Sequence, residues 1–100
     1  MLLTIVMDRK TGVEGRPARL EDAAELIARF ARRSERVMTG AWLVETSEGI
    51  NDWTTRLQTV CEGDDRLLVA ELRSYVGGML PAGLWPWINT RTMTLLTDGR

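Results

Sequence analysis

The chain has 100 residues, 44% of them hydrophobic, which fits one domain with a modest core and excludes two independently folded units. The formal net charge of −1 does not by itself indicate nucleic-acid binding, and the absence of histidine removes the commonest general base and zinc ligand. Cys61 is the only cysteine, which excludes an intrachain disulfide, so we expect a reducing, cytoplasmic setting and a small core residue at this position.

The first predicted element is a buried strand at residues 2–7, because this stretch is short, apolar and rich in β-branched side chains. Asp8 follows it directly, and residues 9–19 contain two glycines and a proline, which is typical of a loop. We identify no signal peptide at the start and no membrane span later in the chain. Asp8 has two interpretations: a strand-end carboxylate that accepts hydrogen bonds from the turn, or a metal ligand.

An amphipathic helix is predicted from Leu20 to about Ala31, because apolar residues recur there at spacings of three and four. Arginines at the end of this helix match the helix dipole, and the run continues beyond the helix. The run consists of Arg29, Arg32, Arg33 and Arg36. A charged run on a helix is usually a solvated face, and this is our first interpretation. A ridge that binds phosphate is the alternative.

The elements in the second half of the core are predicted from turn-forming residues and from the spacing of apolar residues. Two short strands are predicted on either side of a tight turn or bulge at residues 39–40. A second helix is predicted at residues 50–61, with Ser47 as its N-terminal cap and Gly63 as a left-handed residue after it. A strand at residues 66–72 follows a turn.

This order predicts an α+β, ferredoxin-like βαββαβ fold, an antiparallel sheet with two helices on one face. Residues 1–72 form the predicted core. Residues 73–100 form a Trp- and Gly-rich C-terminal extension, which belongs to the same domain or to a dimer interface. We expect its first part to be irregular, with a possible extra strand at residues 92–97. The other face of the sheet is then exposed, covered by a partner or covered by the Trp-rich extension, and we favour a partner.

The role of each tryptophan is inferred from its position in the predicted fold. Trp42 and Trp53 fall on predicted buried faces and are interpreted as core. Trp85 and Trp87 flank a proline, and we expect them to fill a dimer interface or cover an open sheet; stacking on nucleic-acid bases is the alternative. Glu45 and Glu48 flank the predicted start of a helix, where negative charge is expected in any case.

Several segments resemble a known family. They are the apolar strand with its acid, "LTIVMD", the stretch "RVMTGAW" at residues 36–42, and the segments "AWLVETS" and "DDRLLVAEL". Together they make residues 2–72 similar to the small ferredoxin-like CRISPR-associated adaptation proteins often described as endoribonucleases, named the Cas-two family here. The similarity is greatest to stand-alone members of that family.

The resemblance implies a homodimer in which the first-strand aspartates, Asp8 in this chain, face each other and hold a divalent cation such as Mg²⁺. It implies hydrolysis of RNA or DNA phosphodiesters with Asp8 as the catalytic residue and metal ligand. Arg9 and Lys10, together with the arginines Arg29, Arg33 and Arg36, are the candidate contacts to nucleic acid. Two alternatives stay open: a non-catalytic dimeric scaffold for nucleic acid or for a protein partner held through the extension, and a toxin-like ribonuclease.

Overall fold

The computed structural model describes residues 1–8, 18–63, 65–73 and 77–92. In chain order the elements are β1 (Leu2–Asp8), α1 (Ala18–Phe30), β2 (Arg33–Met38), β3 (Ala41–Glu45), α2 (Ile50–Gln58), β4 (Arg66–Leu72), the short 3₁₀ helix η1 (Ala82–Leu84) and α3 (Trp85–Arg91). The first six elements have the predicted types and the predicted order.

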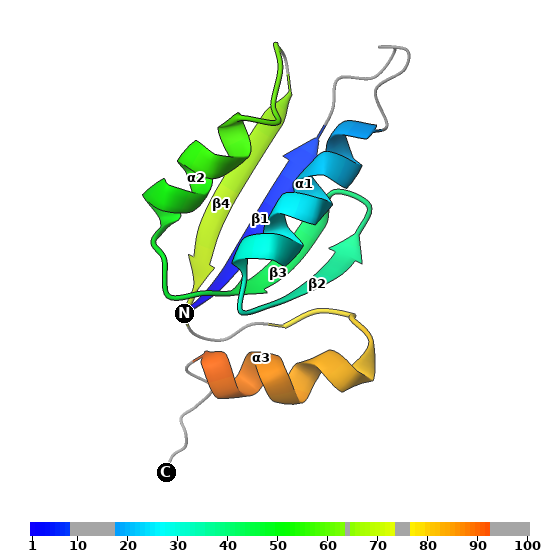
Figure 1. The fold of residues 1–100 in the computed structure, drawn as a ribbon. Coiled ribbons are helices and arrows are strands. Elements are labelled where there is room, and N and C mark those ends of the chain that lie inside the picture. Colours follow the sequence, from blue (N-terminus) through cyan, green and yellow to red (C-terminus); the bar gives the residue numbers. More distant parts are fainter. Residues whose placement is uncertain (9–17, 64, 74–76, 93–100) are drawn as a thin grey trace.

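The four strands form one antiparallel sheet in the order β2-β3-β1-β4, and α1 and α2 lie on the same face of it (Figure 1). This is the predicted ferredoxin-like arrangement, an α+β fold. The first strand is central and pairs with both β3 and β4, whereas β2 and β4 form the edges. The pairing of β1 with β3 ends at Val6 and Ala41, so the last residue of β1, Asp8, pairs with β4 alone.

Side chains alternate between the two faces of the sheet and divide the core into two clusters. The larger cluster lies under the helices and consists of Leu3, Ile5, Met7, Ala23, Ile27, Trp42, Val44, Trp53 and Leu57. Trp42 and Trp53 are thus core residues, as predicted, and Cys61 is partly buried against them. The smaller cluster, on the opposite face, which we call the back face, consists of Leu2, Leu43, Trp87 and Ile88.

The extension differs from the prediction because it contains η1 and α3 instead of irregular chain. Pro86 occupies the first turn of α3, where the missing N–H is not needed. Trp87 and Ile88 then bury one side of the helix against the back face. Trp85 and Trp87 thus cover one end of the back face within the same chain, which was one of our two expectations for them. At that end the cover is the extension and not the partner that we favoured. Residues 93–97 of the possible extra strand lie outside the described residues.

Two helix ends also differ from the prediction. The N-cap of α2 is Gly49, which makes no side-chain hydrogen bond, and not the predicted Ser47. The side chain that accepts a backbone N–H before this helix is Thr46, whose Oγ1 accepts the Glu48 N–H. The helix ends at Gln58, although Gly63 does adopt the predicted left-handed conformation, with φ of 49°. After α1, the Arg32 N–H donates to the Glu45 carbonyl and draws the chain into the sheet.

The hairpin between β2 and β3 depends on a close backbone contact. The Met7 N–H donates a 2.7 Å hydrogen bond to the Gly40 carbonyl oxygen, at the turn predicted for residues 39–40. The pairing of β2 with β3 also shifts register between Arg36 and Met38, which is the bulge anticipated there. A Cβ atom on Gly40 would overlap the Met7 carbonyl, so a side chain here requires the backbone to move.

We therefore expect Gly40→Ala to lower the free energy of unfolding by about 1–3 kcal/mol, the usual cost of forcing extra atoms into a packed site. Urea denaturation followed by circular dichroism measures this change. Gly83→Ala is the matched control, because nothing lies within 4 Å of a Cβ added at Gly83. Equal stability of the two variants would contradict the prediction.

Candidate functional site

The predicted metal ligand, Asp8, lies at the exposed end of β1. It follows the parity of Leu2 and therefore belongs to the back face, directly opposite Arg66 of β4. No hydrogen bond or ion pair links Asp8 to another side chain in the described parts of the chain. Among those same residues, no group of three acidic, histidine or cysteine side chains could hold a metal ion. Asp65 also lies at this end of the sheet, directly before Arg66, so Asp8 is one of at least two acidic residues there.

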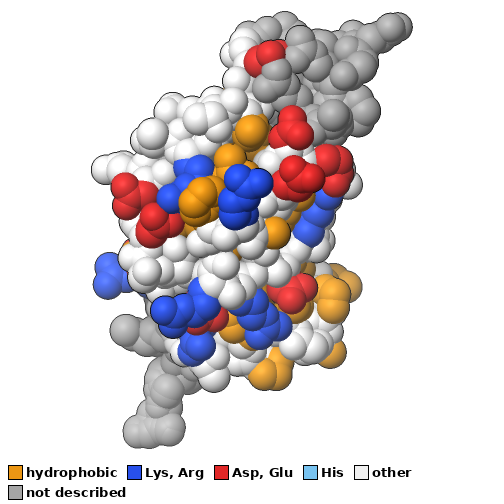
Figure 2. Space-filling model, in the orientation of Figure 1, with side chains coloured by type: hydrophobic (Ala, Val, Ile, Leu, Met, Phe, Trp, Pro, Cys, Tyr) orange, Lys and Arg blue, Asp and Glu red, His pale blue; other side chains and the backbone are white. Residues whose placement is uncertain are grey.

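Arg29, Arg33 and Arg36, the predicted nucleic-acid contacts that the structure describes, do not gather on one surface. On the face drawn in Figure 2, the Lys and Arg side chains lie in separate groups among acidic and hydrophobic ones. Arg9 and Lys10 lie outside the described residues, and Arg29 is exposed on the last turn of α1. The expectation that Arg33 and Arg36 extend the charged run of this helix was wrong, because both belong to β2.

Within β2 these two arginines point to opposite faces. The guanidinium of Arg33 lies 4.2 Å from the ring centroid of Trp87 on the back face. That of Arg36 lies 5.1 Å from the ring centroid of Trp42 on the helix-covered face, and it forms a 3.0 Å ion pair with Glu21. The two therefore cannot line a single ridge.

The strand registers arrange the back face in rows that cross all four strands. The first row contains Arg33, Glu45, Leu2 and Leu72, and α3 covers it. A later row contains Met38, Ala41, Val6 and Leu68, and we call it the apolar row. Met38, Val6 and Leu68 of this row are 65%, 38% and 59% exposed, whereas Ala41 is 8% exposed. Asp8 and Arg66 lie just beyond it, so the uncovered part of the back face is the part beside Asp8.

Glu45 attaches α3 to the sheet. Its carboxylate accepts a 2.8 Å hydrogen bond from Trp87 Nε1–H and forms a 2.9 Å ion pair with Arg91. The hydrogen bond from Trp87, followed by the contact with Arg91, holds the pKa of Glu45 below its ordinary value although burial opposes this. A buried carboxylate is stable only with such partners. The sequence interpretation, which gave Glu45 no role, missed this contact.

We expect Glu45→Gln to loosen α3, because the substitution removes the charge that Arg91 binds. Solvent exchange of the Trp87 indole N–H, followed by NMR, should accelerate about tenfold, which corresponds to about 1.4 kcal/mol. In the wild-type chain this stabilisation is fully present above about pH 4.5 and is lost as the pH falls through the lowered pKa. Glu25→Gln, an exposed change on α1, is the control. Unchanged exchange in Glu45→Gln would argue against the role of this carboxylate.

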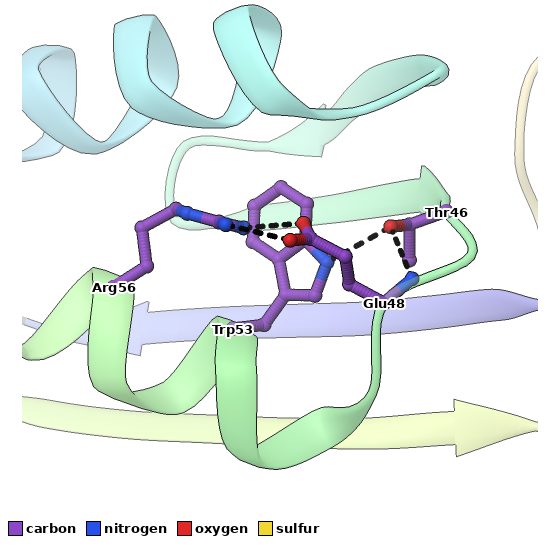
Figure 3. Close-up of polar contacts among 4 residues, drawn as sticks. All are labelled: Thr46, Glu48, Trp53 and Arg56. Atoms are coloured by element: carbon purple, nitrogen blue, oxygen red, sulfur yellow. Dashed lines mark hydrogen bonds and ion pairs between the residues drawn. The ribbon is translucent and has the colours of Figure 1, made fainter.

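A second polar group joins the β3–α2 loop to α2 (Figure 3). Thr46 Oγ1 accepts hydrogen bonds from the Glu48 N–H at 3.0 Å and from the buried Trp53 Nε1–H at 3.1 Å. Arg56 donates to both carboxylate oxygens of Glu48, at 2.8 and 2.9 Å, which holds the pKa of Glu48 below its ordinary value. The guanidinium also lies 4.7 Å from the Trp53 ring centroid, so the loop is fixed from both sides.

Comparison with known proteins gives no family. No protein-family model matches the chain, and no curated protein matches it. No helix in the described ranges is both long and apolar enough to cross a membrane. The function of this chain is therefore a proposal that its own residues have to support.

Proposed function

We propose that this protein is a homodimeric, metal-dependent endonuclease of the Cas-two type, in which Asp8 from each of two copies binds one divalent cation. The observation that supports the proposal best is the arrangement of the back face. Its uncovered apolar row lies directly beside Asp8, while α3 covers only the opposite end of β1. Exposed apolar side chains in one row are typical of a protein interface.

A second copy of the chain is the occupant that fits this row. A twofold contact brings the same surface of each copy together, so it can also place two Asp8 carboxylates side by side. One carboxylate is a poor site for a cation, whereas two carboxylates with several waters suit Mg²⁺. Two copies of Asp8 would thus give a cation a shared site at the dimer axis.

The residues around Asp8 fit phosphodiester chemistry. A cation bound by the two carboxylates would supply a water molecule of lowered pKa as the nucleophile. Arg66 lies opposite Asp8 in the register and is exposed, so its guanidinium can contact a phosphate of the substrate. The protein side chains would align the nucleic-acid strand with that cation, and this mechanism requires no histidine, which the chain lacks.

The catalytic part of the proposal is tested with Asp8→Asn. We expect Mg²⁺-dependent cleavage of RNA or DNA oligonucleotides to fall about a hundredfold or more, because the amide binds the cation far more weakly. Cleavage is measured with end-labelled oligonucleotides at several Mg²⁺ concentrations. The control is Asp22→Asn, which removes an equal charge from an exposed position on α1. Activity that survives in Asp8→Asn would exclude Asp8 as the catalytic residue.

The dimeric part is tested with Leu68→Glu, which places a charge in the apolar row. We expect the wild-type chain to have the mass of two chains by light scattering and the variant to have the mass of one, because burying an unpaired carboxylate opposes association. Met79→Glu, at a side chain that is 98% exposed, should leave the dimer intact. A wild-type monomer would remove the shared site.

The second candidate function is a dimeric scaffold that binds nucleic acid without cleaving it. It uses the same apolar row and leaves Asp8 as a strand-end carboxylate, which agrees with the exposure of Asp8. A dimer that binds oligonucleotides but shows no Mg²⁺-dependent cleavage would favour the scaffold. Growth arrest on expression, abolished by Asp8→Asn, would instead favour the toxin-like ribonuclease.

A further inference from the structure

A groove lies at the end of the sheet opposite Asp8, between the end of α1 and the β3–α2 loop. It has a volume of about 410 Å³ and is lined by Phe30, Ala31, Arg32, Thr46, Ser47 and Glu48. A hollow of about 80 Å³ shares three of these residues, Arg32, Thr46 and Ser47, and adds Met1 and Glu45. Small-molecule sites generally have roughly 300–1,000 Å³, so the groove has room for a ligand of nucleotide size.

Arg32 supplies the charge that such a ligand would meet. It is exposed and lines both hollows, and no hydrogen bond or ion pair joins its guanidinium to a side chain in the described ranges. The two acids at the groove are already occupied: Glu48 is held by Arg56, and Glu45 by Arg91 and an indole N–H. The lining therefore offers an available cation rather than an available anion. A guanidinium with unused donors is suited to a phosphate.

The groove lining also includes an aromatic ring that is held in place. Phe30 is 47% exposed even though the Arg56 guanidinium lies 4.1 Å from the centroid of its ring. The contact with Arg56 fixes the ring, because Arg56 is itself bound to Glu48 through two hydrogen bonds. An exposed, fixed aromatic ring is a surface on which a nucleobase stacks.

We propose that this groove binds a nucleoside phosphate, with the phosphate on Arg32, the base against Phe30, and the hydroxyl of Ser47 at the rim. The site lies about 20 Å from Asp8, the length of a seven-residue strand, so it does not depend on the proposed catalytic site. The ligand has two sources that share this chemistry: a free mononucleotide, or the phosphorylated end of an RNA strand.

Calorimetric titration of the full chain with AMP, adenosine and inorganic phosphate tests the proposal. We expect AMP to bind more tightly than either fragment, and Arg32→Gln to weaken AMP binding about tenfold through loss of a charged hydrogen bond. Arg73→Gln removes the same charge from a side chain that is 80% exposed and does not line the groove, so AMP binding should change less than twofold. Phe30→Leu, a second variant, should weaken AMP but leave inorganic phosphate unchanged.

Three results would overturn the proposal: no AMP binding by the wild-type chain at millimolar concentration, wild-type affinity in Arg32→Gln, or equal losses in Arg32→Gln and Arg73→Gln. Thermal melting of each variant confirms that the fold is retained. The ligand's source is distinguished with a short oligoribonucleotide carrying a 5′-phosphate or a 5′-hydroxyl. Tighter binding of the phosphorylated strand than of AMP assigns the site to strand ends, and the reverse order assigns it to free nucleotides.

Discussion

The carboxylate of Glu45 accepts a hydrogen bond from Trp87 and an ion pair from Arg91, and the position of α3 on the sheet depends on these contacts. Because α3 is fixed over the row that contains Leu2 and Leu72, the back face is covered at the start of β1 and open at its end. The buried carboxylate of Glu45 thus determines which end of the back face is covered by α3 and which end stays exposed. The proposed dimer uses only the second of these.

The helices and strands of residues 1–72 could be predicted from sequence because the spacing of their apolar residues follows which side chains are buried. The apolar spacing from Leu20 to Ala31 and the short apolar strands each report which side chains face the core. The extension was different, because Trp87 is fixed by Glu45, 42 residues earlier in the chain. No local pattern contains a contact of that range, and the nearby glycines and prolines favoured an irregular segment. Tertiary contact therefore decided the structure of α3.

The candidate site could be predicted only in part, for a related reason. The position of Asp8 at a strand end is local and follows from "LTIVMD", whereas the faces of Arg33 and Arg36 depend on where α1 ends. Once the Arg32 N–H bonds to the Glu45 carbonyl, the following arginines alternate across the sheet instead of lining a helix. The groove at Arg32 joins residues from α1 and the β3–α2 loop, and only the β2–β3 pairing brings these together.

The bulge in β2 indicates where this fold can accept an inserted or deleted residue. It lies in an edge strand, so the extra residue near Val37 is absorbed without altering the pairing of β3 with β1. A slip of β3 itself by one residue would exchange Trp42 with Leu43 between the faces and place Glu45 among the core side chains. Natural insertions and deletions in related chains should therefore accumulate at the outer rim of this hairpin, and the two central strands should keep a constant length.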